Sequence, residues 1–149
     1  MREEIKIASA ALTAHFISMK ISVEHIAIVA KNPAALKGWY ERVLGAKPVF
    51  DNGQNPPTCL ISLGNVWFEI YAADKSLPDT ANNKLAGFRH LALRMDSLDA
   101  AKVELEKRGV KFNEAERAAA GGGRIIFFED CEGNLLHLLE RPADSTLGK

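Results

Sequence analysis

The sequence has no excess of charge of either sign. Its 149 residues include 19 lysines and arginines and 19 aspartates and glutamates, so the formal net charge at neutral pH is zero. A protein without a net positive field has no general attraction for nucleic acid or for anionic membranes. We therefore predict no nucleic acid and no membrane among its partners.

Cysteines and long hydrophobic runs are also scarce. The two cysteines, Cys59 and Cys131, lack the paired spacing of a metal knuckle, and two isolated thiols fit a reducing compartment better than a disulfide between them. The most apolar N-terminal stretch, residues 7–19, is interrupted by His15 and follows a segment without net positive charge. It is also too short to span a bilayer. We predict a cytoplasmic protein.

An internal repeat is the most informative feature that the sequence does contain. The run EHIAIV at residues 24–29 resembles RHLALR at residues 89–94. A helical pattern follows each run and ends at a glycine, Gly45 or Gly109. Each copy then continues through an extended segment (residues 47–50 and 110–112) and two strands that are joined by a Gly-Asn turn (58–63 and 66–71; 124–129 and 135–139).

These patterns predict an α+β fold made of two repeated βαβββ modules, residues 21–71 and 88–141. One such module exposes too much of its sheet to be stable alone, so we expect both to form a curved mixed sheet with helices on the outer face. Residues 72–87 form a polar linker between them. Residues 1–20 are predicted to be an N-terminal extension, and residues 142–149 a C-terminal tail.

Strand alternation places one possible metal ligand on each of four strands. His25 and His90 begin the first strands of the two copies, and Glu69 and His137 occupy the last strands. A lone histidine in an apolar strand is more often a core residue, and Glu69 alone could simply face solvent. Four such residues at repeat-related positions favour a metal site, and their donors suit zinc, nickel, iron, manganese or cobalt. Glu140 competes with His137, but alternation places it on the opposite face.

Bulky residues near these positions form a candidate substrate pocket. They are Trp67, Tyr71, Phe88, Arg94 and Phe128. The aromatic residues could equally serve core or dimer packing. Arg94 could hold a substrate carboxylate or phosphate, although a salt bridge is the commoner use of such a residue.

Four segments together resemble the vicinal oxygen chelate superfamily, which includes glyoxalase I, methylmalonyl-CoA epimerase, extradiol dioxygenases, and fosfomycin and bleomycin resistance proteins. The segments are EHIAIVAKNPAALKGWYERVLGAKPVF, VWFEIYA, FRHLALRMDSLDAAKVELEKRGVKF and FFEDCEGNLLHLLE, within residues 21–141. The resemblance implies a glyoxalase-like domain with one divalent metal on His25, Glu69, His90 and His137. Glyoxalase I and the epimerase resemble each other in having glutamate where this chain has His137.

The resemblance also implies a function. We expect a metal-dependent lyase or isomerase that chelates adjacent substrate oxygens to stabilise an enolate or oxyanion, with Glu69 as the first candidate for general base and His137 as the second. The alternatives are a ferrous extradiol-type dioxygenase, with His25, His90 and Glu69 as its triad, and a non-catalytic drug-binding resistance protein. We expect a small-molecule substrate and a homodimer, whose metal sites lie within one chain or draw ligands from both.

Overall fold

The structure is a computed structural model, and it describes residues 21–147. The predicted N-terminal extension, residues 1–20, and the last two residues of the predicted tail lie outside the described residues. The first module consists of β1 (His25–Ala30), α1 (Pro33–Trp39), the π-helical turn η1 (Tyr40–Leu44), β2 (Lys47–Asp51), β3 (Cys59–Leu63) and β4 (Val66–Ala72). The second consists of β5 (His90–Met95), α2 (Leu98–Lys107), β6 (Arg117–Ala118), β7 (Arg124–Glu129) and β8 (Leu135–Glu140).

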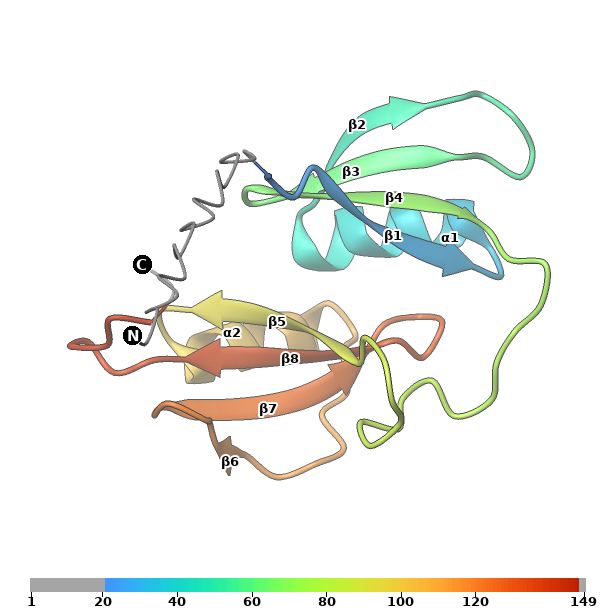
Figure 1. The fold of residues 1–149 in the computed structure, drawn as a ribbon. Helices are drawn as coiled ribbons and strands as arrows, with labels where there is room; N and C mark the ends of the chain where they lie inside the picture. Colours follow the sequence, from blue (N-terminus) through green and yellow to red (C-terminus); the bar gives the residue numbers. More distant parts are fainter. Residues whose placement is uncertain (1–20, 148–149) are drawn as a thin grey trace, which may run out of the picture.

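The two modules have the same topology, which confirms the predicted repeat. Each forms a four-stranded mixed sheet, with strand order β1-β4-β3-β2 in the first and β5-β8-β7-β6 in the second. In each sheet the first and last strands of the module pair in parallel, and the other pairs are antiparallel. Figure 1 shows β1 and β5, the edge strands of the two sheets, facing each other, with a helix against one side of each sheet.

Local backbone requirements define where the helices begin and end. The Asn32 side chain accepts a hydrogen bond from the Ala35 N–H (3.0 Å) at the start of α1, and Pro33 follows it. The first helical segment ends at Gly45, which adopts a left-handed conformation (φ 72°) that other residues rarely adopt. Ser97 caps α2 in the same way as Asn32 caps α1. Among the described residues, the structure contains no helix long and apolar enough to cross a membrane.

The second module differs from the prediction at its short strand. Residues 110–112 were expected to form a strand, but the two-residue β6 lies later, at Arg117–Ala118. Val110 is buried and Phe112 packs against the core, so the apolar side chains of this segment serve core packing rather than strand pairing. Hydrophobic content alone does not distinguish these two uses.

The two modules share one hydrophobic core. Buried residues of both, including Leu36 and Phe68 in the first and Leu136 in the second, form a single cluster. The β7–β8 turn also reaches the first module, where the Glu132 carboxylate accepts hydrogen bonds from the N–H groups at positions 31 (2.7 Å) and 32 (2.6 Å). Nearby, the buried Tyr40 hydroxyl donates to Asp130 (3.4 Å). The modules are therefore fixed to each other on their helical side.

Candidate metal site

The first module brings His25 and Glu69 together on one face of its sheet. Ala27 of β1 pairs with Glu69 of β4. His25 lies two residues before Ala27 and therefore shares its face of the sheet. The His25 Nε2 atom lies 3.6 Å from a Glu69 carboxylate oxygen, and both side chains are partly exposed. On the other side of the ring, His25 Nδ1 contacts the Glu24 carboxylate, and this hydrogen bond raises the pKa of His25.

The second module brings His90 and His137 together in the same register. Ala92 of β5 pairs with His137 of β8, just as Ala27 pairs with Glu69. The centroids of the two imidazole rings lie 4.6 Å apart. Phe127 pairs with His137 across the β7–β8 ladder and contacts both imidazoles edge to face, at centroid distances of 4.9 and 5.4 Å.

His137 is a buried histidine whose ring nitrogens have no hydrogen-bond partner within residues 21–147. Burial lowers its pKa to about 4, and the charges of His90 and Arg141 act in the same direction. The imidazole is therefore neutral at physiological pH and keeps a lone pair. A buried polar group without a partner is costly, and a metal ion would satisfy one of the two nitrogens. The donor set of His137 and the three other candidates thus fits a divalent metal.

Within one chain the four predicted ligands form two half-sites. We call the pair His25 and Glu69 the first half-site, and the pair His90 and His137 the second. In the part of the chain that the structure describes, no three histidine, cysteine, aspartate or glutamate side chains gather closely enough to hold a metal ion. The structure therefore joins the ligands within each module, but it does not bring the two half-sites together.

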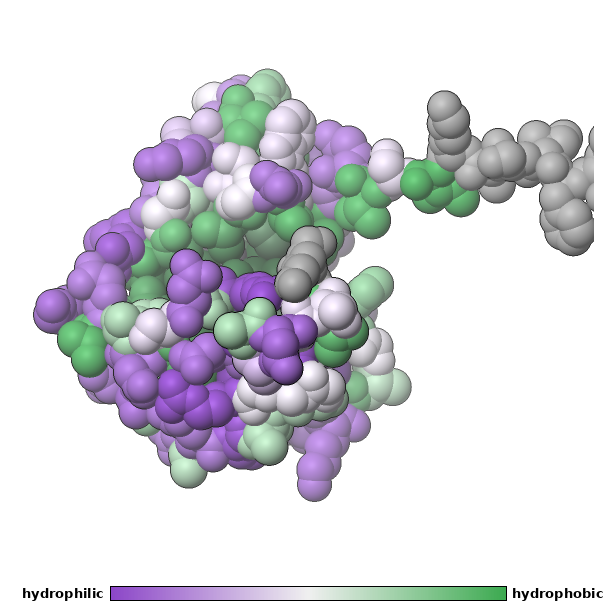
Figure 2. Space-filling view, turned by 90° about the vertical axis from the view of Figure 1, so that its left-hand side faces the viewer, coloured by the Kyte–Doolittle hydropathy of each residue, from purple (hydrophilic) through white to green (hydrophobic). Residues whose placement is uncertain are grey.

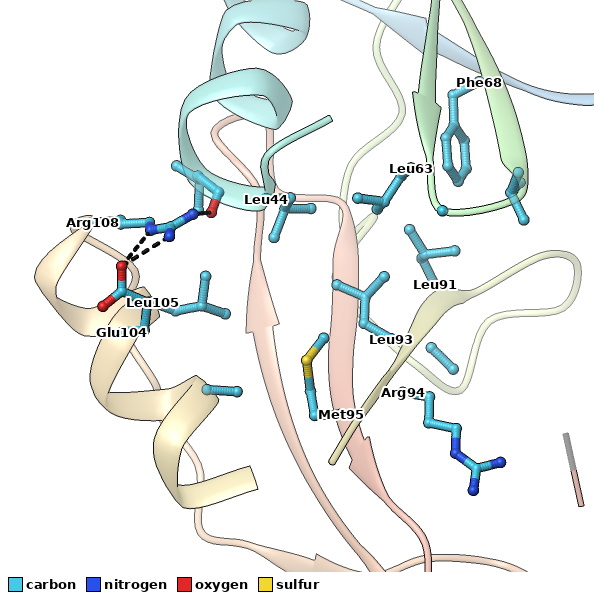
Figure 3. A pocket seen from close by; sticks show the side chains of 15 residues that line it. Leu44, Leu63, Phe68, Leu91, Leu93, Arg94, Met95, Glu104, Leu105 and Arg108 are labelled. Atoms are coloured by element: carbon cyan, nitrogen blue, oxygen red, sulfur yellow. Dashed lines mark hydrogen bonds and ion pairs between the residues drawn. The ribbon is translucent and has the colours of Figure 1, made fainter. Parts of the chain in front are cut away.

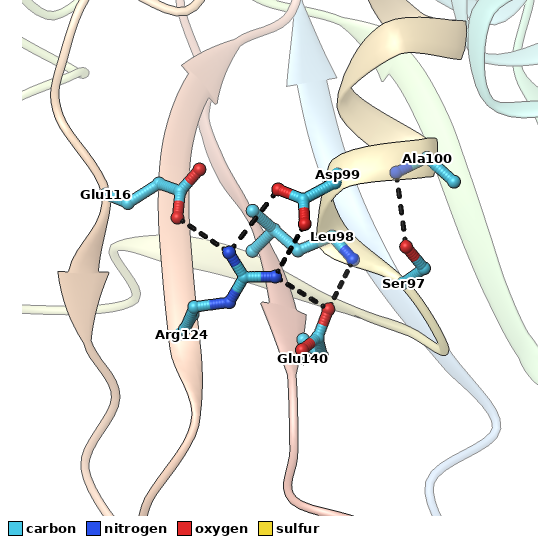
Figure 4. Close-up of polar contacts among 7 residues, drawn as sticks. All are labelled: Ser97, Leu98, Asp99, Ala100, Glu116, Arg124 and Glu140. Atoms are coloured by element: carbon cyan, nitrogen blue, oxygen red, sulfur yellow. Dashed lines mark hydrogen bonds and ion pairs between the residues drawn. The ribbon is translucent and has the colours of Figure 1, made fainter.

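Glu140, the competing ligand, is committed elsewhere. Its carboxylate accepts hydrogen bonds from the Leu98 N–H (2.6 Å) at the start of α2 and from Arg124 (3.1 Å), which also pairs with Asp99 and Glu116 (Figure 4). These contacts lower the pKa of Glu140, with the Leu98 N–H as the largest cause. Glu140 therefore anchors a helix terminus on the face of β8 opposite His137.

The predicted pocket residues are distributed unevenly around the half-sites. Trp67 and Tyr71 share the face of β4 that carries Glu69, and Trp67 is 40% exposed. Phe88 is fully exposed ahead of β5. Arg94 follows His90 on the same face of β5 and donates a hydrogen bond to the backbone carbonyl of residue 147 (2.7 Å).

The structure differs from the prediction at Phe128. Phe128 is buried in the core, where its ring packs against Phe112 at a centroid distance of 5.5 Å. The preceding residue, Phe127, occupies the place beside the histidines that was expected for Phe128. Alternation along β7, read in register with β8, would have identified Phe127, because it lies directly opposite His137.

A cavity of about 520 Å³ lies between the two modules, and Ala92 and Arg94 of β5 are among its lining residues. Figure 2, seen from the left of Figure 1, shows hydrophobic residues gathered in the hollow between the two halves of the molecule. The lining is mainly aliphatic, and none of the four candidate ligands contributes to it. At its rim, Arg108 bonds to Glu104 (2.8 Å) and to the Val43 carbonyl (2.9 Å), which is a further contact between modules (Figure 3).

Two further observations complete the chemistry of the site. Asn83, in the linker between the modules, places its side-chain oxygen 2.9 Å from His90 Nδ1, and no sequence pattern pointed to it. Both cysteines are free thiols, Cys59 buried and Cys131 exposed, so the alternative of a disulfide between them is wrong.

Comparison with known proteins agrees with this architecture. Residues 22–138 match the family model described as the Glyoxalase/Bleomycin resistance protein/Dioxygenase superfamily. Human mitochondrial methylmalonyl-CoA epimerase is 26% identical over 128 residues, which cover 78% of this chain and 72% of the epimerase. A glyoxalase family protein from Enterococcus faecalis has a TM-score of 0.68 at 27% identity, covering 80% of this chain and 97% of the other. The fosfomycin resistance protein FosX from Listeria monocytogenes, crystallised with Mn(II), has a TM-score of 0.63 at 19% identity, covering 84% and 94%.

Proposed function

The chain belongs to the glyoxalase/bleomycin resistance protein/dioxygenase superfamily, and from this premise we propose that it is a metal-dependent enzyme of the lyase or isomerase type. Its ligands are His25, Glu69, His90 and His137, and its substrate is a small molecule with two adjacent oxygens. The metal is zinc, nickel, iron, manganese or cobalt, since nitrogen and carboxylate donors suit these ions. We further propose that the enzyme acts in the cytoplasm as a homodimer.

The state of His137 is the observation that carries this proposal. A structural histidine in a core normally satisfies its ring nitrogens with hydrogen bonds. His137 is buried and kept neutral, and neither nitrogen has a partner among the described residues. It lies beside His90, in the same register as the His25 and Glu69 pair. A buried, neutral imidazole next to a second imidazole has the properties of a metal ligand.

The remaining residues of the site have separate tasks in this proposal. A divalent metal would supply a Lewis acid for two adjacent substrate oxygens and stabilise the negative charge that develops on them. Glu69 is partly exposed, so its carboxylate can reach a substrate proton as the general base, with His137 as the second candidate. Trp67, Tyr71 and Phe127 offer apolar walls, and Arg94 offers a positive charge for an anionic substrate group.

We propose that a second copy of the chain completes each site. The single core and the contacts of Glu132 and Asp130 hold the two modules of one chain in their present arrangement, with the half-sites apart. Closure within one chain would disrupt this packing. The outer edge of β1 instead has no paired strand in the described structure, and Ile26 and Val29, on its two faces, are 45% and 49% exposed. A dimer can cover this surface and bring the first half-site of one chain to the second half-site of the other.

Metal analysis tests the ligand assignment. We expect the purified protein to retain one divalent metal per site, measured by plasma mass spectrometry, and His137→Ala to lose it. Leu139→Ala is the matched control, because it shortens a side chain two positions along the same face of β8 without removing a donor. Unchanged metal content and affinity in His137→Ala would refute the four-ligand site.

Activity measurements then separate the possible reactions. The epimerase relatives make methylmalonyl-CoA the first substrate to assay, by exchange of a substrate proton with deuterated solvent. Oxygen-sensitive ferrous iron with consumption of oxygen on a catechol would instead support the dioxygenase alternative. Tight binding of a drug without turnover by the metal-loaded protein would support the resistance-protein alternative.

A further inference from the structure

We propose that Asn83 is a positioning residue that fixes the tautomer of His90. It holds the ring proton on Nδ1 and leaves the lone pair on Nε2, the nitrogen that then donates to the metal. Asn83 lies in the linker between β4 and β5, seven residues before His90. This inference rests on the proposed metal site, because only a histidine that serves as a ligand needs its lone pair directed in this way.

The geometry of the Asn83–His90 contact indicates where the proton lies. The Asn83 side-chain oxygen is 2.9 Å from His90 Nδ1. An amide oxygen can only accept a hydrogen bond, so the ring nitrogen that faces it must be the donor. A neutral imidazole has only one N–H, and Nε2 therefore keeps its lone pair. The contact thus leaves the lone pair of Nε2 available to bind a metal.

The linker around Asn83 is folded in a way that holds this side chain in place. The N–H of Asn82 donates to the Asp79 carbonyl (2.9 Å), and the N–H of Leu85 donates to the Asn82 carbonyl (3.3 Å). The Asn82 side chain accepts a further bond from the N–H of Lys84 (3.0 Å). The first turn ends just before Asn83 and the second contains it, so both restrict its backbone and direct the amide to His90.

The first module contains an equivalent arrangement. His25 Nδ1 contacts Glu24, and His25 Nε2 faces Glu69 at 3.6 Å. The first histidine of each module therefore has an acceptor on Nδ1, and in His25 the opposite nitrogen already faces another proposed ligand. Acceptors of this kind orient histidine ligands and increase their basicity. Asn83 performs this task without adding a charge next to the second half-site.

The tautomer can be observed directly in the metal-free protein. We expect long-range ¹H–¹⁵N correlation spectra, recorded above about pH 8 where histidines are neutral, to show the His90 proton on Nδ1. Asn83→Ala should shift this proton towards Nε2, which a free imidazole prefers in water. Asn83→Asp should keep it on Nδ1, because a carboxylate accepts the same hydrogen bond. Asn113→Ala, which removes an exposed asparagine outside both half-sites, is the matched control.

Metal titration supplies the second readout. Asn83→Ala should weaken zinc binding about 10–100-fold, the usual effect of removing a partner of a histidine ligand, and Asn83→Asp should restore it. A His90 proton on Nε2 in the unmodified protein would overturn the inference, since the amide would then present its NH₂ group. If the unmodified protein binds metal and Asn83→Ala changes neither the tautomer nor the affinity, this inference is overturned and the proposed metal site stands. A protein with the expected tautomer that binds no metal would refute the proposed function instead.

Discussion

At the scale of single residues, one position along a strand decides between a structural and a functional role. Phe127 and Phe128 are adjacent and chemically identical, but Phe127 contacts both histidines of the second half-site, and Phe128 is 3% exposed in the core. Successive side chains of a strand point to opposite faces, so a shift by one residue exchanges the two environments. The first prediction uses this difference.

Phe128→Ala should lower the free energy of unfolding by about 3–5 kcal/mol, the usual cost of removing a buried aromatic side chain. It should leave the side-chain NMR signals of His90 and His137 close to those of the unmodified protein. Phe127→Ala should shift these signals, because it removes the ring that contacts both imidazoles. Urea denaturation and histidine-detected spectra measure the two effects. Shifted histidine signals in Phe128→Ala, with unchanged signals in Phe127→Ala, would contradict the assignment.

Strand alternation explains how much of the candidate site could be predicted. His25, Glu69, His90 and His137 lie on four strands with regular alternation, so the sequence was enough to place each on its face. The contribution of Asn83 could not be anticipated, because it depends on the turns of an irregular linker and on their position relative to β5. The separation of the half-sites was equally inaccessible, since it follows from how two modules pack rather than from either module alone.

At the scale of secondary-structure elements, one polar residue that was considered as a ligand, Glu140, stabilises a helix end. Glu140 lies at the N-terminus of α2, where its carboxylate accepts the Leu98 N–H and pairs with Arg124. A negative charge at this end of a helix satisfies a free N–H and interacts favourably with the helix dipole. The element that carries His137 is thereby joined to the helix that covers it.

The second prediction concerns the pH dependence of this contact. The pKa of Glu140 is lowered in the folded protein, so its contribution to stability is present above its ordinary value of 4.5 and is lost as the pH falls through the lowered value. Glu140→Gln should therefore destabilise the protein at neutral pH, and the difference from the unmodified protein should shrink below pH 4.5. Urea denaturation over this range measures it. Glu106→Gln, on the exposed side of α2, is the control and should show little effect at any pH.

The elements themselves also show where prediction from sequence ends. Caps and glycines at Asn32, Gly45, Ser97 and Gly109 define the helices, because each satisfies a local backbone requirement. The short strand of the second module was misplaced because Val110 and its neighbours have the hydrophobicity of a strand but are used in the core. Local requirements can be identified from the sequence, whereas a choice between two buried environments is made by the tertiary structure.

At the scale of the whole molecule, the shared core fixes the two modules in place, whereas a complete metal site requires the two kinds of half-site to meet. The core and the Glu132 contacts fix the modules of one chain to each other. The ligands nevertheless lie in two half-sites, with no group of three within residues 21–147. Both observations are satisfied together if the first half-site of one chain meets the second half-site of another.

The third prediction tests this arrangement by complementation. His25→Ala damages only the first half-site, and His137→Ala damages only the second, so each variant alone should bind little metal. If sites are shared between chains, a heterodimer of the two variants contains one doubly damaged site and one intact site. Unfolding and refolding an equal mixture should then restore roughly a quarter of the metal-binding capacity, as expected for random pairing in a symmetric dimer.

The control for this experiment is a mixture of His25→Ala with Glu69→Ala. Both substitutions damage the first half-site, so no combination of these chains contains an intact site, and refolding the mixture should restore nothing. Size-exclusion chromatography with light scattering should show dimers in both mixtures. If the variants damaged in different half-sites also failed to restore metal binding, although each dimerises and folds, the sites would have to form within single chains. The modules would then have to move relative to each other, breaking the contacts of Glu132 and Tyr40 on the helical side.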